Sequence, residues 1–214
     1  MGVRKLCAAT GLGTVLGMTD DQDLRVRGAD WMRGTRRPAV QDAILEIAGE
    51  VFATKGANAS MGDIAAAVGC SRATLYRYFD GRRQLQLAYV ERVARRIGAV
   101  VAETVSDRPE PADRLTESII VALTEVRRDP ALAAWFTAAG AGVAGELALS
   151  SEFIETVATA FLGTGGEDGG EAARWVVRVI VSLLAVPEGS PERERAVIAR
   201  FVTPTVLGFT ETRS

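Results

Sequence analysis

The sequence contains no histidine and only two cysteines, Cys7 and Cys70, which lie far apart. Without histidine, a Ser-His-Asp triad, a Cys-His pair or a mixed Cys/His metal cluster cannot be assembled. Two distant cysteines also give no short Cys spacing for zinc or redox chemistry. The acidic residues are scattered over predicted helix surfaces without a repeated metal-ligand spacing. We therefore expect no enzymatic activity, no metal and no cofactor.

Long apolar runs are lacking too, since no stretch has the length and apolarity of a membrane span. Residues 1–34 carry glycine and threonine breaks and no sustained periodicity, which predicts a disordered arm. A mildly apolar run at 6–18 suggests a signal peptide as an alternative. It contains three glycines and no small-x-small cleavage site, so we expect a cytoplasmic protein. Met1, Met18 and Met32 are all plausible start codons.

Charge is unevenly divided along the chain, although the formal net charge is only −2. Residues 1–109 carry 16 Lys and Arg against 12 Asp and Glu, a balance of +4. Residues 110–214 carry 9 against 15, a balance of −6. This asymmetry favours one end that faces nucleic acid and another that does not.

Apolar residues recur at helical spacing through the rest of the chain, which predicts an all-α fold of about nine helices. Glycines around 140–145 and the run GTGGEDGG at 163–170 are predicted to be a link and a loop. The predicted helices lie at 38–55, 60–68, 71–79, 82–108, 112–128, 131–138, 146–162, 171–186 and 191–207.

The stretch from Ser60 to Leu85 has the signals of two short helices joined by a tight turn. Ser60 and Asp63 form a capping box, which fixes where the first helix starts. Gly69 tolerates the left-handed conformation of a sharp reversal, and Ser71 is a good cap for the next helix. The next helix then interleaves apolar side chains with side chains that donate hydrogen bonds to phosphates or base edges.

The run IAAAVGCSRATLYRYFDGRRQL, residues 64–85, is similar to the helix-turn-helix of TetR-family transcriptional regulators. The family pattern runs roughly I-A-x-x-A-G-V-S-x-G-T-L-Y-x-Y/H-F-x-S-K-E-x-L. The sequence departs from this pattern at Val68, Cys70, Ala73, Gly81 and the pair Arg82-Arg83. We expect Cys70, which stands where the family has valine, to have a small apolar role rather than a redox one.

The resemblance implies a three-helix DNA-binding domain at 35–82 and a helical effector-binding and dimerisation domain at 83–214. In this reading Arg72 and Thr74 read base edges, whereas Ser60, Tyr76, Tyr78 and Arg82 anchor phosphates. The basic segment at 33–37 either touches phosphates or the minor groove, or is a solvated tail. The further residues that we expect at DNA are Met61, Ser71, Ala73, Arg83, Arg36 and Arg37.

Aromatic and polar residues of the C-terminal half are candidates for a ligand pocket, with ordinary core packing as the alternative. The pocket candidates are Trp135, Phe136, Phe153, Thr156, Phe161, Trp175 and Arg178. The last two predicted helices resemble the pair through which family members dimerise, and a monomer core is the alternative. The interface candidates are Val179, Leu183, Val197, Phe201 and Val206.

Together these features predict a homodimeric repressor of a near-palindromic operator on double-stranded DNA, with half-sites about 34–36 Å apart or at a larger set spacing. A small apolar effector is expected to select a conformation that no longer fits the operator. An activator is the close alternative. The alternative of another class is a helical small-molecule-binding or interaction protein that has lost DNA binding.

Overall fold

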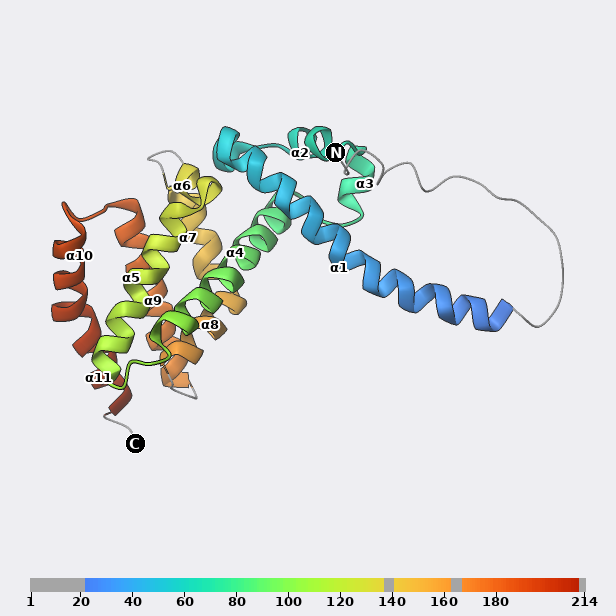
Figure 1. Ribbon diagram of the computed structural model, residues 1–214. Helices are drawn as coiled ribbons and strands as arrows, with labels where there is room; N and C mark the ends of the chain where they lie inside the picture. The colour runs from blue at the N-terminus through green and yellow to red at the C-terminus, as the bar shows by residue number, and fades with distance from the viewer. Residues whose placement is uncertain (1–21, 137–140, 163–166, 212–214) are drawn as a thin grey trace.

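The computed structural model describes residues 22–136, 141–162 and 167–211, and every regular element in these ranges is helical (Figure 1). This confirms the predicted all-α fold. The helices are α1 (Gln22–Lys55), the short η1 (Gly56–Asn58), α2 (Met61–Val68), α3 (Arg72–Tyr76), α4 (Arg82–Val105), α5 (Pro111–Arg128), α6 (Pro130–Trp135), α7 (Ala141–Ser150), α8 (Glu152–Leu162), α9 (Glu167–Ala185), α10 (Pro191–Val197), η2 (Ile198–Val202) and α11 (Thr203–Glu211).

Helix α1 is longer than the sequence predicted. It begins at Gln22 and continues through Pro38, near which the helix was expected to start. Proline has a helical φ and lacks one N–H donor, so a helix can pass through it with the loss of a hydrogen bond. The prediction of a disordered arm is therefore wrong for residues 22–34, and residues 1–21 lie outside the described residues. The first part of α1 projects beyond the helices that α1 packs on (Figure 1).

Helices α1 to α4 share a core with α6. Phe52 of α1, Ile64 of α2 and Leu75 of α3 are fully buried. Trp135 of α6 packs edge-on against Phe52, with ring centroids 4.8 Å apart. Helices α2 and α3 are therefore supported by apolar contacts that extend into the C-terminal half of the chain.

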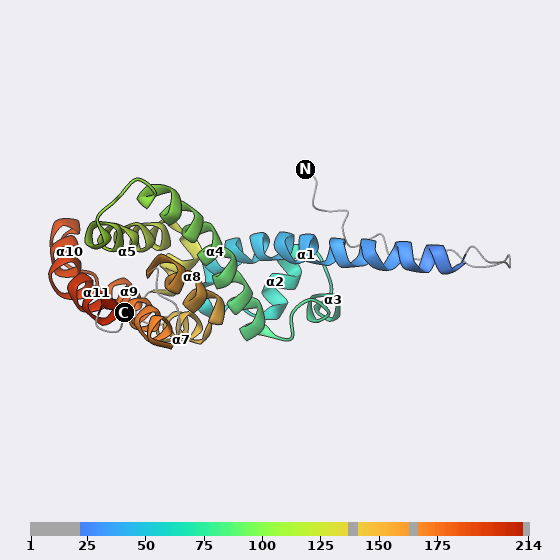
Figure 2. The ribbon, with the colours of Figure 1, turned by 90° about the horizontal axis from the view of Figure 1, so that it is seen from below.

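The remaining helices form a bundle at the other end of the molecule, and α4 connects the two ends (Figure 2). Helix α5 packs beside α4, and α9 packs against α7, α8 and α11. A second core fills the space between α5, α9 and the last helical segments, and it includes the fully buried Leu123 and Ile198.

Three expectations for this bundle are wrong. The run at 163–170 was predicted to be a loop, yet α9 already begins at Glu167, and residues 163–166 lie outside the described residues. The predicted helix 146–162 is two helices, because α7 ends at Ser150 and the Ser151 hydroxyl accepts from the Ile154 N–H as α8 begins. The expected glycine link is partly helical, since α7 starts at Ala141. Gly145 lets α7 approach α9 closely, because a β-carbon there would lie 3.0 Å from a methyl group of Val181. Residues 137–140 lie outside the described part of the chain.

The last helical segment is continuous from Pro191 to Glu211 and contains a π-turn, η2, just before Pro204. Pro204 cannot donate to the carbonyl four residues earlier, and the Thr203 N–H instead donates to the carbonyl of Ile198. A π-turn holds more residues than an α-turn. It therefore helps to keep Ile198, Val202 and Val206 on one buried face. Pro204 is thus accommodated inside the helical segment by widening the preceding turn.

Candidate nucleic-acid interface and internal cavity

The turn between α2 and α3 has the geometry that the sequence predicts. The Ser60 hydroxyl accepts from the Asp63 N–H at 3.2 Å, and Asp63 accepts from the Ser60 N–H at 2.9 Å. Lys55 also donates to Asp63, and these hydrogen bonds hold the pKa of the Asp63 carboxyl well below its usual range. Gly69 has φ +75°, the left-handed conformation expected at the reversal. The start of α2 and the turn are thus both fixed by local contacts.

Helix α3 exposes its first turn and buries Leu75 behind it. Ser71 caps the helix, with its hydroxyl accepting from the Thr74 N–H and lying 2.9 Å from the Thr74 hydroxyl. Arg72 and Ala73 are exposed, and Tyr76 is 52% exposed. Four of the predicted contact residues therefore lie together on the outer side of a short helix, and Thr74 is half-buried beside them.

Arg72 reaches back from α3 over the first turn of α2. A β-carbon at Gly62 would lie 2.5 Å from Nη2 of Arg72, so the guanidinium rests directly on that glycine. The absence of a side chain at 62 lets a long basic side chain cross between the two helices. Arg72 is exposed as a residue, and its long, flexible side chain can swing outward.

Arg37 fastens α1 to the end of α3. Its guanidinium donates to the carbonyl of Arg77 at 3.0 Å and lies 6.0 Å from the centre of the Tyr78 ring. Gln41, one turn along α1, donates to the carbonyl of Tyr78 at 3.1 Å. Two predicted DNA contacts, Arg37 and the half-buried Tyr78, are thus neighbours. The side chain of Arg36 lies outside the described residues.

Three other predicted DNA contacts have different surroundings. The side chain of Met61 is only 7% exposed and packs in the core, so it presents no side-chain surface to DNA. Arg82 is exposed at the first turn of α4. Arg83 is exposed too, but it pairs with Glu146 of α7 at 2.8 Å. This ion pair joins the start of α4 to the C-terminal bundle.

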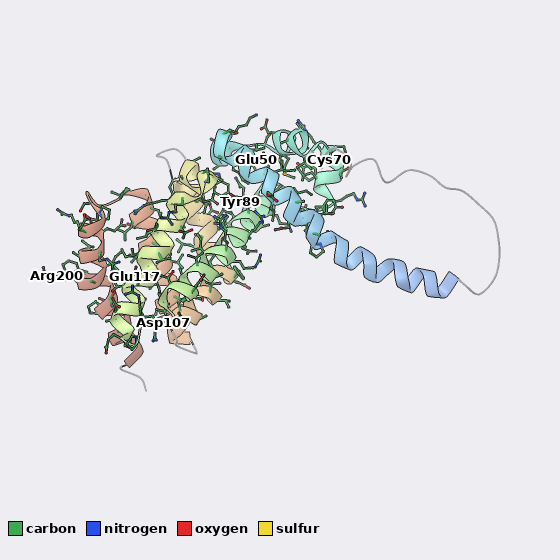
Figure 3. The ribbon with its side chains drawn as sticks, in the orientation of Figure 1. Glu50, Cys70, Tyr89, Asp107, Glu117 and Arg200 are labelled. Atoms are coloured by element: carbon green, nitrogen blue, oxygen red, sulfur yellow. The ribbon has the colours of Figure 1, made fainter. Side chains whose placement is uncertain are left out.

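Cys70, labelled in Figure 3, packs half-buried against the core, as expected.

A buried carboxylate that sequence reasoning did not single out lies where α4 meets α6. Asp129 is 4% exposed and accepts from the N–H groups of Ala131 and Leu132 at the start of α6. It also accepts from the Tyr89 hydroxyl at 3.0 Å and from Arg96 at 2.9 Å. Burial and the charge of Asp129 raise the pKa of Tyr89 well above its usual value. Figure 3 labels Tyr89 on α4, near α1. An Asp-Pro pair at a helix start was the available signal for this cap.

An apolar cavity of about 160 Å³ lies inside the bundle. Helices α4 to α9 all contribute to its wall. The only hydroxyl on the wall among the described residues is that of Ser118, which donates to the carbonyl of Arg114 at 2.8 Å. Phe136 and Phe161, two of the predicted pocket residues, line the cavity.

The other predicted pocket residues do not line this cavity. Trp135 is fully buried beside Phe52, and Phe153 lies under the guanidinium of Arg95 at 5.0 Å. Three more are at the surface: Thr156, Trp175 and Arg178.

The predicted interface residues differ in how far they are exposed. Leu183 and Val206 are buried within the chain and are 9% and 2% exposed. Val179 and Val197 are half-buried. Phe201 is 59% exposed, and Trp175 and Val186 on or just after α9 are also exposed. The exposed apolar side chains on or next to α9 and the last helical segment therefore include Trp175, Val186 and Phe201. Of these three, Phe201 alone was among the predicted interface residues.

The described residues contain no group of His, Cys, Asp or Glu side chains arranged to hold a metal ion. None of the helices within 22–136, 141–162 and 167–211 has both the length and the apolar character needed to cross a bilayer.

Known proteins resemble this chain in sequence and in fold. A model of "Bacterial regulatory proteins, tetR family" matches residues 44–89. An uncharacterized HTH-type transcriptional regulator of Mycobacterium tuberculosis (strain CDC 1551 / Oshkosh) is 46% identical over 184 residues, which cover 84% of this chain and 91% of that protein.

Solved structures share the fold. The TetR family repressor AlkX from Dietzia sp. strain DQ12-45-1b, implicated in biodegradation of n-alkanes, matches with a TM-score of 0.59 at 18% identity, covering 78% of this chain and 95% of that one. A TetR transcriptional regulator from Rhodococcus sp. RHA1 matches with a TM-score of 0.56 at 20% identity, covering 85% and 100%. The 46% identity over most of both chains, together with the family model that matches residues 44–89, shows that the chain belongs to the TetR family of transcriptional regulators.

Proposed function

We propose that this chain is a repressor that binds its operator as a homodimer and releases it when a small apolar effector fills the cavity. The division into a DNA-binding domain at 35–82 and an effector and dimerisation domain at 83–214 is part of this proposal. The observation that carries it is the position of α4. This helix lines the cavity along Val90 to Val101, and it begins at Arg82, a few residues after α3.

The DNA contacts follow from exposure and charge. Arg72 and Thr74, at the first turn of α3, are proposed to read base edges in the major groove. Tyr76, Arg82 and the Ser60 end of α2 are proposed to contact phosphates on either side, because they lie on or next to the two short helices. Arg37 is held to α3 by its hydrogen bond to the Arg77 carbonyl, so we assign it a phosphate beside the reading helix.

Dimerisation is proposed through the outer faces of α9 and the last helical segment, where Trp175, Val186 and Phe201 are exposed. A twofold axis there relates two copies of α3 and predicts a near-palindromic operator. A ligand acts on the operator only through its different affinity for the two conformations of the dimer. Because α4 contributes both to the cavity wall and to the support of α3, a ligand that moves α4 changes the spacing of the two reading helices.

The proposal is tested by selecting fragments from a randomised DNA pool with the purified chain and sequencing those that bind. We expect enrichment of a near-palindrome, bound by a dimer in sedimentation experiments. Transcription from a promoter that carries this site, measured with and without the chain, separates a repressor from an activator. If no palindrome is enriched, the chain acts instead as a helical small-molecule-binding protein without DNA binding.

A further inference from the structure

We infer that the effector of this chain is an uncharged hydrocarbon without a polar head group, a conclusion that rests on the proposed role of the cavity. The inference comes from the chemistry of the wall. Among the described residues, the wall has no charged side chain and no amide, and Ser118 supplies its one hydroxyl. Every other lining side chain is apolar, so recognition inside the cavity depends on shape and dispersion contacts.

The backbone around the cavity offers little to a polar ligand. Most of the lining residues lie inside α4 to α9, where backbone N–H and C=O groups are bonded along the helix. Near the helix starts, the N–H of Leu132 donates to Asp129 and the N–H of Ile154 donates to the Ser151 hydroxyl. The Ser118 proton is already donated to the Arg114 carbonyl at 2.8 Å, so the hydroxyl has only acceptor capacity left. A carboxylate or phosphate needs donors, and the part of the wall that the structure describes provides none to replace the water that such a group would lose.

The volume of the cavity limits which hydrocarbons can serve as the effector. The cavity measures about 160 Å³, close to the ~150 Å³ of an engineered dry cavity that takes up benzene or xenon. Small residues contribute to this space, since Ala94 and Gly98 on α4 and Ala158 on α8 all line it. Gly98 lets α8 approach, since a β-carbon there would lie 3.3 Å from a methyl group of Val157. The space therefore suits a compact ring or a short alkyl chain.

The test uses three probes that share one carbon skeleton: ethylbenzene, 2-phenylethanol and phenylacetate. Binding to the full chain is measured by titration calorimetry and by the shift in melting temperature, in the absence of DNA. We expect saturable binding of ethylbenzene, weaker binding of 2-phenylethanol, and binding of phenylacetate that is weaker by at least roughly 100-fold. Binding of phenylacetate as tight as that of ethylbenzene, or no saturable binding of ethylbenzene, would overturn the inference.

Matched variants locate the probe in this cavity. Ala158→Phe should abolish ethylbenzene binding, whereas Ala160→Phe, at an exposed position on the same helix, should leave it unchanged. If Ala158→Phe fails to fold by circular dichroism, Ala94→Leu with the exposed Ala102→Leu as control replaces the pair. Ser118→Ala should leave ethylbenzene binding intact and weaken only 2-phenylethanol. Ethylbenzene binding that is unchanged in a folded Ala158→Phe or Ala94→Leu variant would contradict the inference.

The two proposals fail in different ways. If ethylbenzene binds in the cavity but the affinity for the selected operator does not change, effector-controlled release is refuted and the ligand class stands. If the chain binds its operator and phenylacetate alone binds the protein and releases the operator, the repressor mechanism stands and the hydrocarbon class is refuted.

Discussion

Removing one hydroxyl at the junction of α4 and α6 should measurably destabilise the protein. Tyr89 is 4% exposed and donates to the buried Asp129 at 3.0 Å. Tyr89→Phe keeps the ring, whose centroid lies 5.3 Å from that of Phe52, and removes only the hydrogen bond. A hydrogen bond to a charged acceptor contributes about 1.5–3 kcal/mol. Asp129 retains Arg96 and two backbone N–H donors, so we expect a loss near the lower end, about 1.5–2 kcal/mol.

The assay is reversible urea unfolding at pH 7, with thermal unfolding as a second measurement. A loss of this size should lower the melting temperature by roughly 3–8 °C for a chain of this length. Tyr76→Phe is the matched control, because it removes a hydroxyl from a tyrosine that is 52% exposed. The control should change the free energy of unfolding by less than about 0.5 kcal/mol. A Tyr89→Phe variant as stable as this control would refute the reasoning.

The stability difference between the wild type and Tyr89→Phe should also depend on pH in the alkaline range. Because the pKa of Tyr89 is raised in the folded chain, tyrosine ionises first in the unfolded state, near its ordinary pKa of 10.0. The folded wild type therefore loses stability as the pH rises above that value, by up to about 1.4 kcal/mol per pH unit. Phenylalanine does not ionise, so the difference between wild type and Tyr89→Phe should narrow between pH 9 and 11. A constant or widening difference would count against the buried hydroxyl.

Five further substitutions test DNA binding, local stability and assembly. Arg72→Ala should cost about 1–3 kcal/mol of operator affinity and relax base preference, whereas Arg82→Ala should weaken binding to all sequences and reduce the salt slope by about one unit, as measured by fluorescence anisotropy. Asp63→Asn should lower stability at neutral pH. Because the folded pKa is depressed, this difference should shrink as the pH falls below the ordinary 3.8, which a series of urea titrations would check. Gly69→Ala, at φ +75°, should cost about 1–2 kcal/mol in the same titrations. Phe201→Glu should give a monomer in sedimentation, and an unchanged dimer would locate the interface elsewhere.

Local features of this fold could be read from the sequence because they depend on residues within a single turn. The capping box of Ser60 and Asp63 and the left-handed Gly69 are of this kind, and both are confirmed. The start of α1 was misjudged by the same local reasoning. Pro38 is compatible with both a helix start and a helix interior, and only the structure distinguishes them.

The cavity could not be located from the sequence because it depends on small residues from several helices. Trp135 and Trp175 were both pocket candidates, yet Trp135 is buried against Phe52 of α1 and Tyr89 of α4, and Trp175 lies at the surface. The space itself is made by residues such as Ala94 and Ala158, which carry no sequence signal of their own. Arg83 pairs with Glu146, which is far away in the sequence, so no local sequence pattern could predict this ion pair.

The contact of α4 with α1 has a mechanical consequence. Tyr89 of α4 packs directly on Gly49 of α1, where an added β-carbon would lie 2.9 Å from the tyrosine ring. We take this contact as the pivot about which α4 can tilt like a lever. At about 1.5 Å per residue, Arg82 lies about 10 Å from this point and Val101 about 18 Å on the other side. A displacement of about 2 Å at Val101 would then move Arg82 by only about 1 Å, in the opposite direction. Such a lever attenuates motion, so the displacement of Arg82 should stay smaller than the displacement that a ligand causes at Val101 and should grow in proportion to it. Operator release should therefore increase gradually along a series of alkylbenzenes of increasing size.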